Sequence, residues 1–409
     1  MSDDPRRTFL HQLFAAGLAA VDARARTAAA LRRHLTQTNW PQRWQVIAVG
    51  KAASRMMLGA SEVLGPRLAR GWLTTKDAHI DAHCAALPHI RCLESGHPVP
   101  DQRSLDAGGE LLAELTALPG DTALLVLVSG GASSLVEVLQ SGVALRELQQ
   151  LNERGLANGW NIERINRERS GLSQIKGGGL LQRCGNRPTL ALFVSDVPDD
   201  DPAVIGSGLA APAAGATDHV TREIIARLDD ALSAIAALAS STGLRVSRVR
   251  ERLSGDAALR GAHCVAAMSH SDAELLIWGG ETTVSLPARA GRGGRNQHLA
   301  LAAALALCDV TPARHRQMLL LSAGTDGSDG VSDDAGAVVD SESVQRMRDA
   351  GVDPHAALAM ADSGAALEAA GDLLYTGPTG TNVCDVVLAL RLAADDPRLP
   401  RSRAGASML

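Results

Sequence analysis

Four short segments of this sequence combine glycines with hydroxyl or basic side chains. They are Gly50-Lys51-Ala52, residues 129–134 (SGGASS), Lys176-Gly177-Gly178-Gly179 and residues 291–297 (GRGGRNQ). Unhindered backbone N–H groups at the start of a helix bind phosphate or carboxylate through oriented amides and the helix dipole. A nearby Lys or Arg adds positive charge. One such segment alone often only turns the chain, but four of them together predict that the protein binds a small anion.

Lysine is scarce enough for its positions to be informative. Only three of the 40 basic residues are lysines, namely Lys51, Lys76 and Lys176. In a chain that otherwise uses Arg, a retained Lys indicates a need for a compact ammonium group rather than a planar guanidinium. Lys51 and Lys176 both adjoin glycine-rich turns, so we expect these two to have a chemical role.

Two acidic turns complement the basic ones. Residues 195–201 (SDVPDDD) and 325–334 (TDGSDGVSDD) each carry four carboxylates. Like charges this close are costly unless a cation joins them, and Mg²⁺ typically takes one or two carboxylates together with substrate phosphates. Asp196 directly follows an apolar run and is the favoured metal ligand. Residues 199–201 fit a solvated loop that caps the next helix equally well.

Three common catalytic signatures are absent. The P-loop pattern fails because Gln45 and Ala52 stand where Gly and Ser or Thr are needed. The dinucleotide fingerprint fails at Asn296, which replaces its third glycine. A nucleophile elbow would need glycine at Leu135. His97, in Ser95-Gly96-His97-Pro98, is interpreted as a structural residue of a rigid turn.

Composition excludes several classes of protein. With 409 residues, 45% of them hydrophobic, and a net charge of −5, the chain should fold into two or three domains rather than stay disordered. No apolar run reaches the roughly 18 residues of a membrane span, and the first residues lack a signal-peptide layout. Six scattered cysteines without a Cys-x-x-Cys pair predict a reducing, cytoplasmic location. Few aromatics and a pI near 6.2 argue against nucleic-acid binding.

Apolar runs that end in these turns predict the fold class. Continuous apolar runs are typical of strands covered on both faces, as in parallel α/β sheets. Helical patterns at 103–117, 222–240 and 296–307 alternate with them, after an amphipathic helix at 7–35. The class is therefore α/β with right-handed crossovers, and ligands should bind beyond the carboxyl ends of the strands. The five runs occupy 46–49, 124–128, 190–194, 275–278 and 318–321.

The motifs, in this order, resemble the class II glycerate 2-kinases of the MOFRL type, some members of which carry the older name hydroxypyruvate reductase. The resemblance spans roughly residues 45–390 and, as a set, it is highly specific. The motifs that carry it are Gly50-Lys51-Ala52, Gly96-His97-Pro98-Val99-Pro100-Asp101, Ser129-Gly130-Gly131-Ala132-Ser133, Leu172-Ser173-Gln174-Ile175-Lys176-Gly177-Gly178, Ser195-Asp196-Val197-Pro198, Gly279-Gly280-Glu281-Thr282-Thr283-Val284, residues 291–297, Gly324-Thr325-Asp326-Gly327 and Gly377-Pro378-Thr379-Gly380-Thr381-Asn382-Val383.

The resemblance implies a fold and a reaction. It implies a Rossmann-like parallel-sheet domain (1–245), a smaller α/β domain of the MOFRL type (246–409) and an active site in the cleft between them. It also implies ATP and Mg²⁺ as cofactors, and phosphoryl transfer to the 2-hydroxyl of D-glycerate or a related 2-hydroxy acid. Lys51 matches the family's catalytic lysine, and Arg295 matches its catalytic arginine.

These considerations give a full hypothesis for the site. Lys51 and Arg295 stabilise the moving phosphoryl group, and Asp196 binds Mg²⁺ or orients the acceptor hydroxyl. The expected acceptor-binding residues are Ser129, Gly130, Gly131, Ser133, Arg169 and Lys176. The expected ATP-binding residues are Gly280, Glu281, Thr282, Gly293, Gly294, Asn296, Thr325, Asp326, Thr379 and Asn382.

Departures from the family pattern leave alternatives open. The family commonly has other residues at Gly179, Asp199, Leu209 and His298, so tartronate or a four-carbon sugar acid could replace glycerate as the acceptor. An NAD(P)H-dependent hydroxypyruvate reductase and a non-catalytic anion-binding relative are the rival functions. We expect neither a nucleic-acid nor a membrane partner, and both a monomer and a homodimer fit the sequence.

Overall fold

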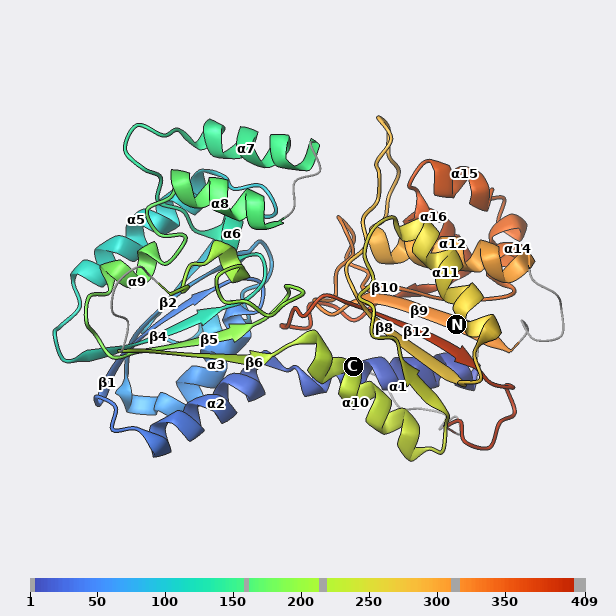
Figure 1. Ribbon diagram of the computed structural model, residues 1–409, viewed down its shortest axis with the longest axis horizontal. Helices are drawn as coiled ribbons and strands as arrows, with labels where there is room; N and C mark the ends of the chain where they lie inside the picture. Colours follow the sequence, from blue (N-terminus) through green and yellow to red (C-terminus); the bar gives the residue numbers. More distant parts are fainter. Residues whose placement is uncertain (1–3, 158–161, 213–218, 310–316, 401–409) are drawn as a thin grey trace. The chain divides into compact units, whose positions relative to one another are not determined.

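The chain folds into two compact units, neither of which is a single continuous segment. The computed structural model describes residues 4–157, 162–212, 219–309 and 317–400. The parallel-sheet unit comprises residues 22–227 and 380–383, and the mixed-sheet unit comprises residues 1–21, 228–379 and 384–409 (Figure 1). The predicted boundary at 245/246 assumes two consecutive segments, whereas the chain passes between these units at several points.

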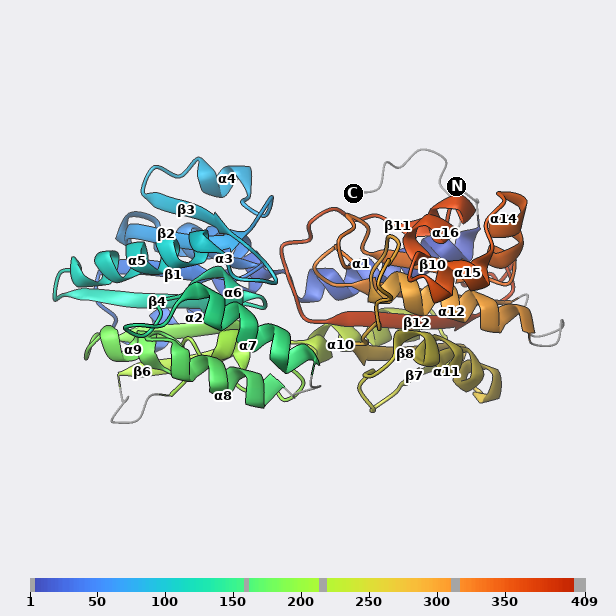
Figure 2. The ribbon, with the colours of Figure 1, turned by 90° about the horizontal axis from the view of Figure 1, so that it is seen from above.

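The parallel-sheet unit contains the Rossmann-like sheet that the family resemblance implied. Its six strands are all parallel and follow the order β3-β2-β1-β4-β5-β6, which is the strand order of the dinucleotide-binding fold (Figure 2). The strands are β1 (Arg43–Val49), β2 (Leu68–Lys76), β3 (Ile90–Ser95), β4 (Thr122–Val128), β5 (Thr189–Val194) and β6 (Val220–Ala226).

Helices cover both faces of this sheet, which explains its continuous apolar strands. Helices α2 and α3 lie on one face, and α5, α6 and α9 lie on the other (Figure 1). Every residue of β4 and β5 is buried. The helices are α2 (Ala23–Gln37), α3 (Ala53–Leu64), α4 (Ala82–Ala85), α5 (Gln102–Thr116), α6 (Ala132–Leu135), α7 (Leu145–Ala157), α8 (Ile162–Leu172) and α9 (Gly179–Arg183), with 3₁₀ turns at Gly65–Arg67 and Ile205–Ser207.

The mixed-sheet unit has a second six-stranded sheet, of order β11-β10-β9-β12-β8-β7. The apolar runs at 275–278 and 318–321 do form strands, but their expected parallel pairing is wrong: both pair antiparallel with β12, and only β7 and β8 are parallel. Apolar runs reflect burial on both faces, and helices cover both faces here as well. The strands are β7 (Val246–Arg248), β8 (Leu275–Gly280), β9 (Met318–Gly324), β10 (Gly336–Asp340), β11 (Leu373–Leu374) and β12 (Asp385–Arg391).

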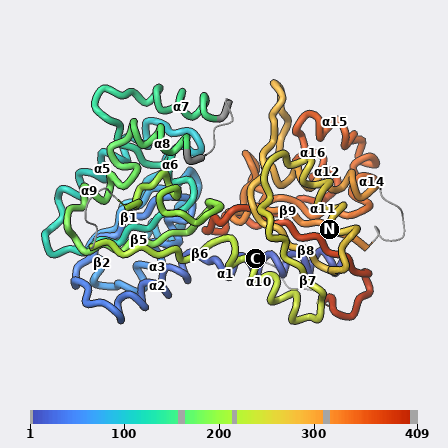
Figure 3. Tube along the Cα trace, in the orientation of Figure 1, coloured from blue at the N-terminus to red at the C-terminus, as the bar shows by residue number. Residues whose placement is uncertain are grey.

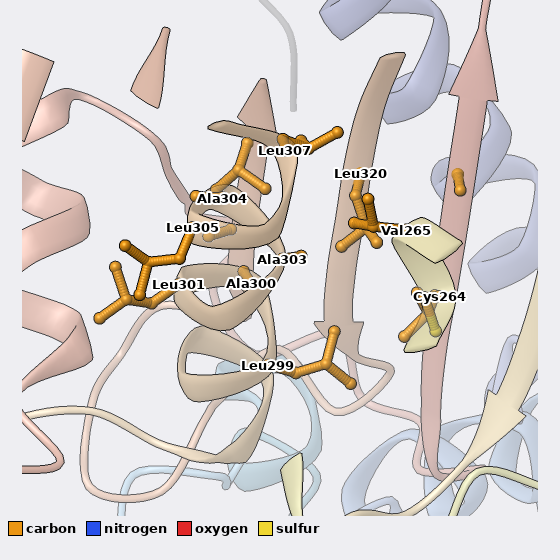
Figure 4. Packing of buried hydrophobic residues seen from close by; sticks show 14 of the residues in the cluster. Cys264, Val265, Leu299, Ala300, Leu301, Ala303, Ala304, Leu305, Leu307 and Leu320 are labelled. Carbon is orange, nitrogen blue, oxygen red and sulfur yellow. The ribbon is translucent and has the colours of Figure 1, made fainter. Parts of the chain in front are cut away.

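Helix α12 is central to the core of the mixed-sheet unit. Its side chains, including Leu299 and Leu307, pack beside Leu320 of β9, and Cys264 and Val265 of α11 lie close by (Figure 4). The opposite face of the sheet is covered by α1 and α10. The helices of this unit are α1 (Pro5–Ala20), α10 (Leu228–Ser241), α11 (Ala257–His270), α12 (Arg295–Asp309), α14 (Ser343–Asp349), α15 (Pro354–Ala359) and α16 (Ser363–Ala370).

Two predicted helices differ from the structure. The expected single helix at 7–35 is two helices, because Asp22 leaves the helical conformation (φ −56°, ψ 112°). Its carboxylate accepts a hydrogen bond from the N–H of Ala25 (2.7 Å), which starts α2. Helix α1 then runs beside α10 in the mixed-sheet unit (Figure 3). The helix expected at 222–240 begins only at Leu228, since residues 220–226 pair with β5 as a strand.

None of the helices in the described part of the chain is both long and apolar enough to cross a lipid bilayer.

The close approach of α2 and α3 depends on Gly59. A β-carbon at this position would lie 2.2 Å from the carbonyl oxygen of Arg24, which belongs to the backbone of α2. We therefore expect Gly59→Ala to push the helices apart and to lower the free energy of unfolding by roughly 1–3 kcal/mol, measured by urea denaturation. Gly109→Ala is the matched control, because Gly109 lies in the interior of α5 with open space around it. This change should raise stability by about 0.5–1 kcal/mol, and shifts of the same sign in both variants would contradict the packing described here.

Candidate functional site

The loop after β4 presents two backbone amides. The N–H of Ser129 donates to the carbonyl of Val49 (3.0 Å) and the N–H of Ala132 donates to Ser129 (3.4 Å). Among the described residues, the N–H groups of Gly130 and Gly131 have no hydrogen-bond acceptor. Gly131 has a left-handed conformation (φ 82°) and precedes α6. The amide cradle expected at 129–133 therefore centres on the two glycines, and Ser129 supports it.

Two polar side chains lie against Gly130. A β-carbon there would be 2.0 Å from Oδ2 of Asp196 and 2.1 Å from Nδ2 of Asn382, so only glycine fits. The Nδ2 group of Asn382 donates to Oδ2 of Asp196 (3.1 Å). Asn382 belongs to the segment 380–383, which is part of the parallel-sheet unit although both of its flanks belong to the other unit. The structure thus brings together Gly130, Asp196 and Asn382 from three separate parts of the sequence.

Lys51 and His97 lie beside the second glycine. A β-carbon on Gly131 would be 3.0 Å from the imidazole Nε2 of His97 and 3.2 Å from Cγ of Lys51. Lys51 follows β1, and His97 follows β3, so both lie at the carboxyl edge of the sheet together with the loop after β4. The interpretation of His97 as a purely structural turn residue overlooked this position. Its place two residues after the last residue of a strand is the signal that could have indicated a site residue.

The amides at the start of α3 are already used within the protein. The N–H of Lys51 donates to the carbonyl of Gly130 (2.9 Å), that of Ala52 to Oγ of Ser129 (3.0 Å), and that of Ala53 to the carbonyl of Gly50 (3.1 Å). In dinucleotide-binding proteins this helix start holds the pyrophosphate. Here the amides of Lys51 and Ala52 donate to the loop after β4, so they do not form an amide cradle like that of dinucleotide-binding proteins.

Lys176 is buried directly behind α6. Its ammonium group donates to the carbonyls of Val136 (2.9 Å) and Ala132 (3.3 Å), and the residue is only 3% exposed. Burial lowers the pKa of Lys176 to about 8, with the nearby Glu137 carboxylate opposing the shift. Glu137 is itself fully buried; Ser173 donates to its Oε1, and its Oε2 has no partner among the described residues.

Arg169 is a second, half-buried cation, and the hydroxyl of Ser207 connects it to the loop after β4. Its guanidinium donates to Oγ of Ser207 (2.8 Å) and to Oδ1 of Asn152 (2.7 Å). The Oγ of Ser207 lies 2.7 Å from Oγ of Ser133 and within a hydrogen bond of Asn166 (2.9 Å). Burial lowers the pKa of Arg169. Ser133, Arg169 and Lys176 therefore lie in one polar cluster around α6.

In the mixed-sheet unit, Arg295 is the first residue of α12 and is held by carboxylates. Its Nε donates to Oδ2 of Asp385 (2.5 Å) and its Nη2 to Oδ1 (3.0 Å), while Nη1 pairs with Glu281. Burial alone would lower the pKa of Arg295, but the facing carboxylates raise it above its ordinary value. Sequence reasoning did not identify Asp385, which lies in no motif and contacts Arg295 only through the fold.

Asp329 fixes the start of the same helix. It accepts hydrogen bonds from the N–H groups of Asn296 (3.1 Å) and Gln297 (2.8 Å). Burial raises the pKa of Asp329 to about 7. A β-carbon on Gly294 would be 2.3 Å from the Asp329 carboxylate, which accounts for this glycine. Asn296 also accepts from Oγ of Ser322 (2.7 Å), so its side chain is buried and bonded within the unit.

The other residues of the mixed-sheet unit that were expected to bind ATP lie at three places. Oγ1 of Thr379 donates to the carbonyl of Thr325 (2.5 Å), and its N–H donates to that of Asp326 (3.3 Å). The turn after β8 pairs with residues 253–255, where the N–H of Glu281 donates to Leu253 (2.9 Å). Gly280, Glu281 and Thr282 are at this second place, and Gly293 and Gly294, at the third, precede α12.

The departures from the family pattern have local structural explanations at two positions. A β-carbon on Gly179 would lie 2.4 Å from the carbonyl oxygen of Gln174, so the turn here is too close for a larger residue. His298 is 8% exposed, its Nδ1 lies 3.0 Å from Oγ of Ser363, and burial lowers its pKa. Leu209 is fully buried and Asp199 is exposed.

No group of three or more His, Cys, Asp or Glu side chains is arranged to hold a metal ion in the described part of the chain. Asp196 offers a single carboxylate at the end of β5. That donor set fits Mg²⁺ that arrives with a nucleotide, because Mg²⁺ is usually bound by one or two carboxylates together with substrate phosphates and water.

Comparison with known proteins identifies the family. A family model described as a domain of unknown function (DUF4147) matches residues 9–238, and a MOFRL family model matches residues 274–385. The D-glycerate 2-kinase of Thermotoga maritima is 36% identical over 84% of this chain and 90% of its own length. The chain belongs to the MOFRL-type glycerate 2-kinase family. An Agrobacterium vitis relative, 35% identical over 83% of this chain and 97% of its own length, is named only provisionally, as a hydroxypyruvate reductase.

Solved structures of glycerate kinase relatives have the same fold. The crystal structure of glycerate kinase from Thermotoga maritima has a TM-score of 0.80 and 32% sequence identity, covering 94% of this chain and 99% of that one. A protein of Pyrococcus horikoshii has a TM-score of 0.71 at 26% identity, covering 96% and 99%. The Rossmann-like sheet and the separate second sheet are therefore confirmed as the fold of this glycerate kinase relative.

Burial of Lys176 predicts a change of stability at high pH. The pKa falls from 10.5 in an exposed lysine to about 8 in the folded protein, so between these values the unfolded chain binds more protons than the folded one. The free energy of unfolding should therefore rise as the pH increases from 8 to 10.5, by at most about 3 kcal/mol. A neutral amine still has two N–H donors for the carbonyls of Ala132 and Val136.

The measurement is urea unfolding across this pH range, with Lys176→Met as the comparison. The wild type should gain stability relative to Lys176→Met as the pH rises. A difference between the two proteins that is independent of pH would contradict the buried, low-pKa ammonium.

Proposed function

We propose that this protein transfers the γ-phosphoryl group of ATP to the 2-hydroxyl of D-glycerate or a closely related 2-hydroxy acid. The observation that carries the proposal is the 36% identity to a D-glycerate 2-kinase over 84% of the chain. The site residues that match the family motifs support it. Lys51, Gly131 and Asp196 lie at the carboxyl edge of the parallel sheet, where such folds bind ligands.

The parallel-sheet unit would bind the acceptor and part of the transferred group. The amides of Gly130 and Gly131 cradle an anionic oxygen, and Lys51 adds positive charge beside them. Asp196 orients the acceptor hydroxyl or binds Mg²⁺. Arg169 and Lys176 provide the positive charge that attracts the acceptor carboxylate, as proposed from the sequence, together with Ser129 and Ser133 in the loop that they support.

The mixed-sheet unit would bind ATP and supply the second catalytic cation. Phosphoryl transfer needs positioning and charge neutralisation more than covalent chemistry. Arg295 stabilises the equatorial oxygens of the moving group. The nucleotide-binding residues in this proposal are Gly280, Glu281, Thr282, Gly293, Gly294, Asn296, Thr325, Asp326 and Thr379, with Asn382 from the segment 380–383. When bound with ATP, Mg²⁺ would neutralise phosphate charge.

The reductase alternative is less well supported by the site. Its pyrophosphate would occupy the start of α3, where the amides of Lys51 and Ala52 already donate to Gly130 and Ser129. A non-catalytic relative would have no need for both Lys51 and Arg295.

We propose the cytoplasm as the location of the protein. Its reducing conditions suit the free thiols of all six cysteines, and it supplies ATP.

The deciding experiment measures ADP release with Mg·ATP over a panel of acids that includes D-glycerate, tartronate and four-carbon sugar acids. Phosphorus NMR of the product distinguishes 2-phosphoglycerate from 3-phosphoglycerate. NADH and NADPH consumption with hydroxypyruvate is measured in parallel. Turnover with a nicotinamide cofactor and none with ATP would overturn the proposal, and the absence of both activities would support a non-catalytic relative.

Substitution of the two cations tests their roles. Lys51→Met and Arg295→Met should each lower kcat on the order of 10²–10³-fold, because each removes a charge that acts in the transition state. Arg292→Met is the control within the same glycine-rich loop, since Arg292 forms an exposed ion pair with Glu368. The control should retain kcat near the wild-type value, and circular dichroism should show that all three variants are folded. An unchanged kcat in either Lys51→Met or Arg295→Met would reject that residue's role.

A further inference from the structure

Arg295 is held from one side by a buried carboxylate. Asp385 receives two hydrogen bonds from it, from Nε to Oδ2 (2.5 Å) and from Nη2 to Oδ1 (3.0 Å). Paired contacts of this kind fix the plane of a guanidinium as well as its position. The side chain of Asp385 is 6% exposed, whereas that of the other carboxylate on Arg295, Glu281, is 50% exposed. Asp385 is thus the rigid partner of the two.

The backbone of Asp385 is fixed by its place in the sheet. It is the first residue of β12, an interior strand, and it lies opposite Gly280 of β8 and Gly324 of β9. The backbone of Arg295 is fixed as well, because Asp329 accepts from the N–H groups of the next two residues of α12. Both ends of the Arg295–Asp385 contact therefore rest on regular secondary structure.

The contact uses only part of the guanidinium. An arginine has five N–H donors, and Asp385 takes two of them along the Nε–Nη2 edge. The remaining donors, on Nη1 and Nη2, form the other edge, where Nη1 pairs with the exposed Glu281. Asp385 therefore fixes which edge of Arg295 stays outside the paired contact.

We propose that Asp385 is a positioning residue for Arg295 in phosphoryl transfer, acting through the guanidinium and not on the substrate. This inference rests on the proposed function, in which Arg295 stabilises the transferred group. Misplacement of a catalytic group by about 1 Å can cost on the order of 10²-fold in rate. Asp385→Asn keeps the shape of the side chain but loses one acceptor and the charge, so it should lower kcat roughly 10–100-fold with little change in KM for ATP or the acceptor.

A double-mutant cycle separates positioning from a structural role. Lysine in Arg295→Lys cannot form the paired contact, so Asp385→Asn should cost much less kcat in that background than in the wild type. An equal loss in both backgrounds would overturn the proposal. Asp385→Glu is the second variant, used in case the Asp385→Asn protein does not fold. It keeps the negative charge but displaces the guanidinium of Arg295. We therefore expect kcat to fall while the thermal midpoint stays close to that of the wild type.

Asp372→Asn is the matched control for loss of a buried, arginine-bound carboxylate. Asp372 accepts from Arg7 (2.8 Å) and Arg346 (2.6 Å) in the same unit, and its side chain is 1% exposed. The Asp372→Asn substitution should lower the thermal midpoint of unfolding while kcat stays near the wild-type value. If Asp385→Asn leaves kcat unchanged although Arg295→Met lowers it, the positioning role is wrong and the proposed function stands. If Arg295→Met has no effect on kcat, the catalytic role of Arg295 in the proposed function fails first.

Discussion

The absence of side chains at Gly130 and Gly131 is the constraint on which the candidate site depends. Asp196 and Asn382 occupy the space of a β-carbon on the first glycine, and His97 and Lys51 crowd that of the second. The same loop also ties α3 to the sheet, because the carbonyl of Gly130 and the hydroxyl of Ser129 accept the amides that start this helix. A larger residue at Gly130 would therefore displace Asp196, and one at Gly131 would displace His97 or Lys51. Either change would disturb the loop that holds the start of α3.

Much of the fold follows from the sequence because burial leaves a clear pattern. All five apolar runs form strands, and the helices expected at 103–117 and 296–307 are α5 and α12. Strand direction leaves no such pattern. β8 and β9 have the same apolar character as parallel strands, but they pair antiparallel with β12. The break between α1 and α2 escaped notice because one capping residue, Asp22, interrupts a helical periodicity that otherwise continues.

Some residues of the candidate site could be predicted from the sequence, and others could not. Residues just beyond the ends of parallel strands, such as Lys51, Ser129 and Asp196, could be predicted, because topology brings strand ends to one edge. Asp385 and the contact of Asn382 with Asp196 could not. Their partners lie 90 and 186 residues away in the sequence, and neither pairing has a characteristic spacing. His97 is intermediate, since its place after β3 was available but its glycine- and proline-rich surroundings suggested a simple turn.

The positive charges around α6 fit the proposed binding of an anion better than a purely stabilising role. Lys176 and Arg169 share one buried carboxylate, Glu137, so the cluster keeps an excess of positive charge when Lys176 is protonated. Burying charges in this way is costly, and a buried ion pair is weak evidence for stabilisation. The carbonyls of Ala132 and Val136 need only two N–H donors, which a neutral amine also provides. The positive charge itself is therefore not required to hold α6, and in the proposed function it attracts an anion to the loop in front of it.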